Sequence, residues 1–224
     1  MLIVLEGLDG AGKSTQISLI KEHFELQGAC VRYLHYPRFD APIYGELIAK
    51  FLRGDFGPID SVHPTLVALL FAHDRNDSSQ MLRDWLNRGD IVLLDRYVYS
   101  NIAFQCAKVL CVEQREELRD WIFNLEYNVF GIPKPDFNFF LDVPLNFVEQ
   151  RLSSVREGDD RLYLDGKSDI HESDLSFQAQ VRDIYLKECE KESDLVRVSC
   201  YNEIDKLLLE PKMVLNNILS FIKK

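Results

Sequence analysis

Short apolar runs alternate with amphipathic segments along the chain. The runs at residues 1–5 and 91–94 are typical of strands that are buried on both faces of a sheet. The amphipathic segments carry apolar residues at helical spacing, as at Ile17, Ile20 and Phe24, where Gly28 ends the pattern. The predicted strands are residues 1–5, 29–35, 91–94, 137–141 and 195–199. The predicted helices are residues 13–27, 44–52, 64–88, 113–125, 145–152, 175–191 and 212–222.

This alternation is typical of a three-layer α/β fold, in which helices cover both faces of a parallel sheet of about five strands. No repeat, low-complexity tract or linker interrupts the pattern, so we expect a single domain over residues 1–224. Residues 153–169 are polar, charged and contain glycine, and we expect this segment to be mobile.

Composition and charge limit the possible partners. Hydrophobic residues make up 46% of the 224 residues, which is enough for a sizeable core and argues against disorder. The formal net charge is −10. Binding to nucleic acid requires Lys and Arg to displace counterions from the phosphates, so we expect no nucleic-acid partner. A small anionic substrate remains possible, because a local cationic pocket can oppose the overall charge.

Cysteine usage and hydropathy indicate a cytoplasmic protein without a membrane partner. The five cysteines are odd in number and include no C-x-x-C pair, which favours reduced thiols. The first residues lack the features of a signal peptide, since Glu6 follows the short apolar run at once. No apolar run approaches the roughly 20 residues that span a bilayer.

Residues 7–14, with the sequence GLDGAGKS, match the phosphate-binding loop pattern G-x-x-x-x-G-K-[ST] in full. Glycines let successive backbone N–H groups point at phosphate oxygens, and the following helix adds positive potential at its N-terminus. Lys13 is expected to reach the β- and γ-phosphates of ATP, and Ser14 to bind Mg²⁺. A predicted strand before the loop and a helix after it disfavour a chance glycine-rich turn. The predicted ATP-binding residues are Gly7, Leu8, Asp9, Gly10, Ala11, Gly12, Lys13, Ser14 and Thr15.

The loop by itself leaves the phosphoryl acceptor open, because GTPases, motor ATPases and small-molecule kinases share it. The chain is too short to include a mechanical or effector domain as well. It also lacks the Asn-Lys-x-Asp sequence that a GTPase would usually carry for guanine. These observations favour a kinase that acts on a small molecule.

Asp95 and Arg96 directly follow the predicted strand at residues 91–94. Ligands of such sheets bind at the carboxyl ends of the strands, which would place both side chains near the phosphate loop. Asp95 could hold Mg²⁺ through water, and Arg96 could bind an acceptor phosphate. From the residues alone, an ordinary ion pair at the end of a strand is equally plausible.

Several further segments, in consistent order and spacing from residue 1 to about residue 150, resemble thymidylate kinase. The helix with Phe71 and Arg75, followed by Asp-Arg-Tyr and a serine, is the most specific part, because it differs from adenylate and guanylate kinases. The segments are residues 7–10 (GLDG), 36–38 (YPR), 71–75 (FAHDR), 95–100 (DRYVYS), 103–105 (AFQ) and 133–136 (PKPD).

The resemblance implies a P-loop NTPase fold, ATP-dependent phosphorylation of dTMP to dTDP with Mg²⁺, and a homodimer. The acceptor phosphate is already an anion, so the site needs no strong base but needs cations that hold two anions in line. Lys13, Arg38 and Arg96 are expected to supply that charge. By resemblance, Arg38 and Arg96 hold the acceptor phosphate and Asp9 approaches the deoxyribose 3′-hydroxyl.

Base recognition, again by resemblance, falls to Phe71 and Arg75, which lie four residues apart and so on one face of a helix. Phe71 would stack on thymine and Arg75 would donate to its O4 atom, with Phe104 near the 5-methyl group. Without the surrounding motifs, core packing would be the better interpretation of both aromatic residues. The predicted acceptor-binding residues are Asp9, Tyr36, Arg38, Phe71, Arg75, Arg96, Tyr99, Ser100, Phe104 and Gln105.

The resemblance makes residues 153–169 a lid over the triphosphate. Some family members carry a catalytic arginine in the phosphate loop, where this chain has Gly10 and Ala11. We therefore expect the lid to supply it, from Arg156 or Arg161. Lys167 is a weaker candidate because an ammonium cannot fork across two oxygens.

Two alternatives remain at this stage. A deoxynucleoside kinase, which phosphorylates a neutral 5′-hydroxyl, usually has a carboxylate after the second strand, where this chain has Arg38. A P-loop switch that binds nucleotide without phosphorylating a metabolite is the other. The sequence leaves open the preference between dTMP and dUMP and the role of residues 203–212.

Overall fold

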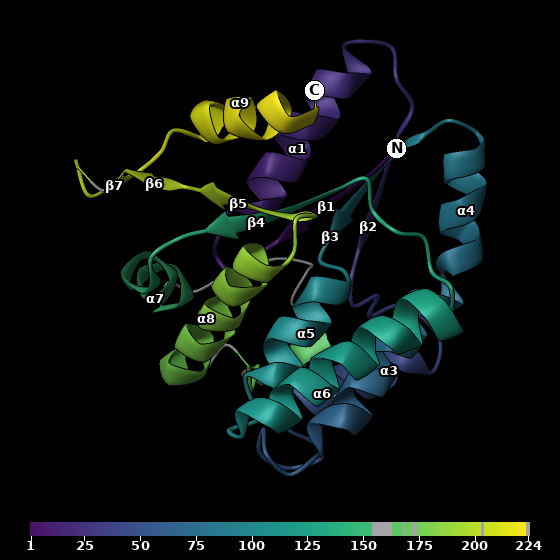
Figure 1. Cartoon of the computed structure of the whole chain (residues 1–224), viewed down its shortest axis with the longest axis vertical. Helices are drawn as coiled ribbons and strands as arrows, with labels where there is room; N and C mark the ends of the chain where they lie inside the picture. The colour runs from purple at the N-terminus through teal and green to yellow at the C-terminus, as the bar shows by residue number, and fades with distance from the viewer. Residues whose placement is uncertain (154–162, 168, 172–173, 203, 223–224) are drawn as a thin grey trace.

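A five-stranded, fully parallel sheet forms the centre of the molecule, with strand order β2-β3-β1-β4-β5 (Figure 1). The computed structural model describes residues 1–153, 163–167, 169–171, 174–202 and 204–222. This arrangement confirms the predicted fold class. The strands are β1 (Leu2–Glu6), β2 (Val31–His35), β3 (Ile91–Asp95), β4 (Phe137–Asp142) and β5 (Leu195–Ser199).

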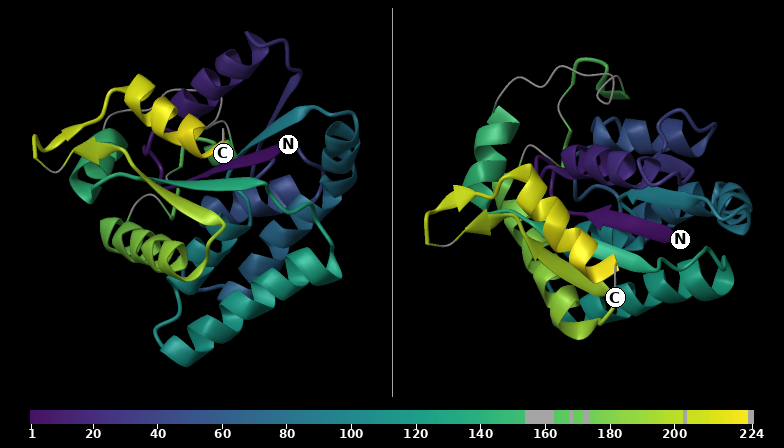
Figure 2. Two further views of the ribbon diagram at one scale, coloured as in Figure 1. Left: turned by 45° about the horizontal axis from the view of Figure 1, so that its top comes forward. Right: turned by 90° about the horizontal axis from the view of Figure 1, so that it is seen from above.

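Helices cover both faces of the sheet (Figure 1). On one face, α9 lies beside α1, as both views in Figure 2 show. On the other face, α5 packs against α3, α6 and α8. The helices are α1 (Lys13–Glu25), α2 (Tyr44–Leu52), α3 (Pro64–Asp77), α4 (Ser79–Asn87), α5 (Val98–Cys106), α6 (Val112–Phe123), α7 (Leu145–Ser153), α8 (Leu175–Lys191) and α9 (Pro211–Ile222). None of the helices in the described part of the chain is long and apolar enough to span a membrane.

The central strands are mostly apolar because helices cover both sides of them, and each ends in an acidic residue. Every residue of β1 is buried, and so are all but the first residues of β3 and β4. β2 is an edge strand with exposed and half-buried positions. The uninterrupted apolar runs in the sequence therefore correspond to the strands that are enclosed on both faces.

The helix that we expected over residues 64–88 is two helices, α3 and α4, which meet at Ser78. The Ser78 hydroxyl lies 3.3 Å from the carbonyl oxygen of Asp74 and 3.1 Å from that of Arg75, and 2.5 Å from the Tyr36 hydroxyl. A serine that bonds back to the preceding turn competes with the backbone and bends helices. The apolar spacing carries no sign of this contact.

The sequence pattern did not predict helix α5. All nine of its residues are buried, so it has no polar face to produce an amphipathic pattern. The predicted helix 113–125 is α6 continued by a π-helical turn, Asn124–Val129, which is a rare geometry often found at functional sites. A small antiparallel hairpin, β6 (Tyr201–Asn202) with β7 (Leu207–Leu208), was also not predicted.

Candidate active site

The phosphate loop leaves the carboxyl end of β1 and enters α1. Gly10 and Gly12 have φ angles of 79° and 92°, in the left-handed region that favours glycine. The Lys13 ammonium donates to the carbonyl oxygens of Gly7 and Leu8 at 3.3 and 3.1 Å, and lies 3.9 Å from Oδ1 of Asp95. Lys13 therefore already points over the inside of the loop, where the phosphates of a nucleotide would lie.

Burial lowers the pKa of the Lys13 ammonium, and the nearby guanidinium of Arg96 lowers it further, while Asp95 and Asp9 oppose this shift. A bound anion would act in the same direction as these two carboxylates. The loop therefore encloses a cation that polyphosphate would stabilise in its charged form.

An open groove, here called the loop groove, runs along the phosphate loop and brings together residues of the loop, the start of α1, β2 with the segment after it, and the end of β3. It holds the predicted metal ligands Ser14 and Asp95, and also Arg38. Oδ1 of Asp95 is buried and finds no hydrogen-bond partner among the described residues. A serine hydroxyl and an unpartnered carboxylate oxygen are ligands that suit Mg²⁺. The described residues include no cluster of three or more His, Cys, Asp or Glu that could hold a metal, so phosphate and water would have to complete the coordination.

A second hollow, here called the inner cavity, adjoins the loop groove and shares Asp9 and Phe39 with it. It collects residues from the loop, from helices α2, α3 and α5 and from the segment before α8. Eight of the predicted acceptor-binding residues line it: Asp9, Tyr36, Phe71, Arg75, Arg96, Ser100, Phe104 and Gln105.

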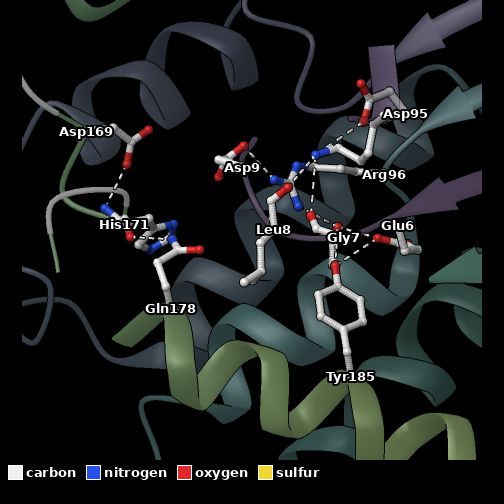
Figure 3. A network of polar contacts seen from close by, with 12 residues as sticks. Glu6, Gly7, Leu8, Asp9, Asp95, Arg96, Asp169, His171, Gln178 and Tyr185 are labelled. Carbon is white, nitrogen blue, oxygen red and sulfur yellow. Dashed lines mark hydrogen bonds and ion pairs between the residues drawn. The ribbon is translucent and has the colours of Figure 1, made fainter. Parts of the chain in front are cut away.

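Arg96 directly follows β3 with a φ of 68° and lines the inner cavity, where it binds Asp9, a residue of both hollows. Its Nη2 donates to Asp9 at 2.7 Å and its Nη1 to Ser100 at 3.2 Å (Figure 3). Its guanidinium also lies 5.1 Å from the centre of the Phe104 ring. Burial works against the charge on Arg96, but Asp9, Asp95 and Glu6 around it together outweigh burial, and the pKa of Arg96 is raised. Arg96 is a fixed cation beside the loop.

Glu6, which the sequence analysis did not identify, lies near Arg96 (Figure 3). It is fully buried at the end of β1 and accepts hydrogen bonds from the backbone N–H of Tyr97, the hydroxyl of Tyr185 and the hydroxyl of Ser100. Burial raises the pKa of the Glu6 carboxyl, although these donors counteract part of the shift. An acid ending an apolar strand was the available signal in the sequence.

Arg38 lies in the loop groove but is held against α3. Its Nε donates to Asp74 at 2.9 Å, and its Nη2 donates to Asp77 at 2.6 Å and to the Asp74 carbonyl oxygen at 2.9 Å. In this arrangement a phosphate would share Arg38 with two carboxylates. The structure thus places Arg38 beside the groove with much of its donor capacity already used.

Arg75 and Asn101 are both bound by one buried carboxylate, Glu126, on the π-helical turn. Arg75 donates to it through Nε and Nη2, and Asn101 donates through Nδ2 at 3.0 Å. Burial opposes the charge on Arg75, but Glu126 raises its pKa above the ordinary value. The other Nδ2 hydrogen of Asn101 goes to the carbonyl oxygen of Ala68, so Oδ1 faces away from these acceptors.

Oδ1 of Asn101 is buried, has no hydrogen-bond partner among the described residues, and belongs to a residue that lines the inner cavity. Sequence reasoning missed both Asn101 and Glu126. The sequence offered a signal for Asn101, because it directly follows Ser100, the last residue of the motif at residues 95–100. Nothing local to Glu126 marks it, since its partners are 25 and 51 positions away.

Tyr99 is not among the residues that line the inner cavity in the described part of the chain, contrary to our expectation. Its hydroxyl bonds to Asp194 at 2.5 Å and its ring packs edge-on against Phe123. The cavity-facing residues of α5 are Ser100, Asn101, Phe104 and Gln105. At about 100° per residue, Tyr99 falls on the opposite side of the helix from their centre.

The second half of the expected lid packs against the inner cavity. The ring of Tyr163 stacks on Phe39 with centroids 3.7 Å apart, and Arg53 donates to the Tyr163 carbonyl oxygen at 2.7 Å. Lys167 pairs with Asp55 at 2.6 Å. Asp169 lines the cavity, and so does His171, two residues past the expected lid. Arg156 and Arg161 lie outside the described residues.

His171 was not predicted as a site residue. Its ring packs beside Phe104, Phe51 and Phe177 with centroids 5.2–5.5 Å apart, and its Nε2 is buried without a hydrogen-bond partner among the described residues. Burial lowers the pKa of His171 well below its usual value, and Lys108 adds to the shift. His171 therefore presents a neutral imidazole to the cavity at neutral pH.

Comparison with known proteins agrees with this geometry. The family model described as thymidylate kinase matches residues 5–208. A probable thymidylate kinase of Thermococcus kodakarensis is 34% identical over 212 residues, covering 92% of both chains. The thymidylate kinase of Mycobacterium tuberculosis is 31% identical over 189 residues, covering 84% of this chain and 85% of the relative.

A solved structure of thymidylate kinase from Candida albicans has a TM-score of 0.73 to this chain at 26% identity. The match covers 99% of this chain and 90% of the other. The family match therefore extends over the phosphate loop, the inner cavity and the helices around them, and the chain belongs to the thymidylate kinase family.

Proposed function

We propose that this protein transfers the terminal phosphoryl group of ATP to dTMP, giving dTDP. The observation that carries this proposal is the set of polar groups in the inner cavity. Among the described residues, Arg75 uses Nε and Nη2 for Glu126, which leaves Nη1 as a donor for a ligand. Asn101 offers the acceptor Oδ1, and Gln105 offers an amide.

This set suits the edge of thymine, which presents the acceptor O4, the donor N3–H and the acceptor O2. Arg75 as donor to O4 and Asn101 as acceptor from N3–H match the first two positions. Cytosine has an amino group and a bare N3 at those positions, so both pairs would be mismatched. Each buried group left unpaired costs about 1–3 kcal/mol, and the cavity therefore disfavours cytosine.

Phosphoryl transfer follows from the arrangement at the junction of the two hollows. Lys13 would bind the phosphates of ATP, Ser14 and Asp95 would hold Mg²⁺, and Arg96 would hold the phosphate of dTMP. When bound, Mg²⁺ neutralises charge on the phosphates. Asp9 faces both hollows and would meet the 3′-hydroxyl. Because the acceptor oxygen is already charged, these residues act by positioning and by electrostatic stabilisation.

The same proposal gives roles to the remaining acceptor-side residues. Arg38 would assist at the acceptor phosphate from the rim of the loop groove, in competition with Asp74. The ring of Phe71 would stack on thymine, with Phe104 near its methyl group. That methyl contact is worth about 1 kcal/mol, so discrimination between dTMP and dUMP through it would be modest. We place the protein in the cytoplasm.

We also propose a homodimer. The helices beneath the sheet carry large apolar side chains at exposed positions, among them Leu66 on α3 and Val112 at the start of α6, which are 61% and 57% exposed. Sedimentation analysis at micromolar concentration should give twice the chain mass of 26.0 kDa. A species of single chain mass would contradict the dimer.

The test of the function is ADP release from ATP with Mg²⁺, measured with dTMP, dCMP, thymidine or no acceptor. We expect kcat/KM for dTMP to exceed that for dCMP by roughly 100-fold or more. Preference for thymidine over dTMP would instead support a deoxynucleoside kinase. ADP release that no acceptor stimulates would support a nucleotide-binding switch.

A further inference from the structure

Lys108 lies two residues beyond α5, next to Gln105 of the inner cavity, and has no role in the mechanism above. Its Nζ donates to Oε1 of Gln105 at 2.8 Å. The same nitrogen lies 4.8 Å from the centre of the Phe51 ring and 6.0 Å from that of Phe177. These rings enclose the ammonium, and burial lowers the pKa of Lys108 to about 7, with Asp169 opposing the shift.

The Lys108 contact fixes the orientation of the Gln105 amide. Below its pKa, Lys108 is an ammonium with donors and no acceptor, so it can then bond only to the oxygen of an amide. Oε1 must therefore face Lys108, and Nε2 is the end of the amide left for the cavity. Gln105 is 1% exposed and lines the cavity, and among the described residues its Nε2 makes no hydrogen bond.

We propose that Lys108 is a positioning residue that holds the Gln105 amide with its NH₂ group toward the inner cavity, as a donor to a keto oxygen of the acceptor base. This inference rests on the proposed function. It completes a donor–acceptor–donor set with Arg75 and Asn101, which matches all three groups on the thymine edge. Cytosine shares the O2 acceptor, so Arg75 and Asn101 select against cytosine, whereas the Gln105 donor adds affinity for either base.

A purely structural role does not explain why this position holds a lysine. Phe51 and Phe177 form an apolar surround in which an unbranched methionine side chain of similar length would be buried without the cost of desolvating an ammonium. A lysine at such a place is more easily explained by what its N–H group does to Gln105.

The test compares Lys108→Met with the wild-type enzyme. We expect KM for dTMP to rise about tenfold with kcat changed less than about threefold, because the base is bound alike in the ground and transition states. KM for dCMP should rise by a similar factor, because cytosine shares the O2 acceptor that Gln105 reaches, while the melting temperature stays the same or rises. Lys187→Met, on the exposed side of α8, removes the same charge and should change none of these values.

A double-mutant cycle with Gln105→Leu tests whether Lys108 acts through Gln105. In the Gln105→Leu background, Lys108→Met should change KM for dTMP by less than about twofold. Lys108→Ala removes the donor and leaves the space beside Phe51 unfilled, and it should raise KM for dTMP as Lys108→Met does.

A wild-type KM for dTMP in both Lys108 variants, or an undiminished effect of Lys108→Met in the Gln105→Leu background, would overturn the inference. Failure of the proposed function looks different, since the wild-type enzyme itself would then not release ADP with dTMP.

Discussion

At the scale of single residues, Glu126 is the group on which the proposed base recognition most depends. It is 0% exposed and binds Arg75, itself 2% exposed, and Asn101 at once. A buried carboxylate that accepts three hydrogen bonds holds two recognition groups in one fixed relation. Its removal should therefore affect binding of the base and stability of the fold together.

We expect Glu126→Gln to raise KM for dTMP at least tenfold, because an amide cannot accept from both Arg75 nitrogens as a carboxylate does. The free energy of unfolding should fall by about 3–5 kcal/mol, since Arg75 would be left buried without its counter-charge. Steady-state kinetics and urea unfolding measure the two effects. Glu113→Gln, exposed on α6, is the matched control, and equal behaviour of both variants would contradict the assignment.

Lys13→Ala should lower kcat by two orders of magnitude or more, because Lys13 meets charge that grows on the transferring phosphoryl group. The fold should persist, since the ammonium donates only to loop carbonyls in this structure. Turnover together with a thermal melt gives both quantities. Lys21→Ala, on the exposed part of α1, serves as the control. Near-normal turnover in a folded Lys13→Ala protein would end the phosphoryl-transfer proposal.

His171 should make stability depend on pH. Its pKa in the folded protein lies well below the ordinary value of 6.5, so below pH 6.5 the unfolded chain takes up a proton that the folded chain does not. The free energy of unfolding should then fall, by at most about 1.4 kcal/mol per pH unit, until the folded pKa is reached. Urea unfolding between pH 7.5 and 5.5 measures this slope.

His171→Phe should flatten that slope, since phenylalanine fits the aromatic surround of Phe51, Phe104 and Phe177 and does not titrate. His23→Gln, on α1 away from the cavity, should leave the slope unchanged. An equal slope in wild type and His171→Phe would show that other groups cause the pH dependence.

At the scale of elements, the segment before α8 combines two tasks. Its second half already rests on the inner cavity through Tyr163 and Asp169, which are bonded to each other at 2.7 Å. The arginines that we expect to reach the transferred phosphoryl group precede this anchored half. A segment fixed at one end to the acceptor side can sense an occupied cavity and bring a cation to the donor.

We expect Arg156→Ala or Arg161→Ala to lower kcat by several orders of magnitude while dTMP affinity without ATP stays nearly constant. Arg156 is the first choice, because it lies nearer the end of α7. Lys167→Ala should matter less, because Lys167 is paired with Asp55. Single-turnover kinetics on the three variants decide the matter. Rates within about threefold of wild type in all three would mean that the lid supplies no catalytic cation.

At the scale of the whole molecule, the sheet explains why two hollows meet at one place. β1 lies between β3 and β4, and all three strands are parallel. Their carboxyl ends therefore bring the phosphate loop after β1 next to Asp95 and Arg96 after β3. In the proposed reaction, the phosphate donor and acceptor would lie at neighbouring strand ends, which is the alignment that an in-line transfer requires.

The sequence alone determined the strands of the sheet, their parallel direction and the position of the phosphate loop. Uninterrupted apolar runs specify strands covered on both faces. The phosphate loop, whose glycines must take left-handed angles, is recognised from consecutive residues. The helices at Tyr44–Leu52 and Leu175–Lys191 were predicted to the residue for the same reason, because their signals are local. The spacing of the motifs also predicted most residues that line the inner cavity, from Phe71 to Gln105.

Only the tertiary structure decided which polar groups support that cavity. Glu126, Lys108 and His171 are single residues without a periodic signal, and each takes its meaning from partners brought to it by the fold. The same holds for α5, which is buried on all sides, and for Tyr99, whose direction depends on where the helix axis lies. Local patterns fix elements and loops, whereas the contacts of buried charges arise from segments far apart in the chain and appear only when those segments are packed together.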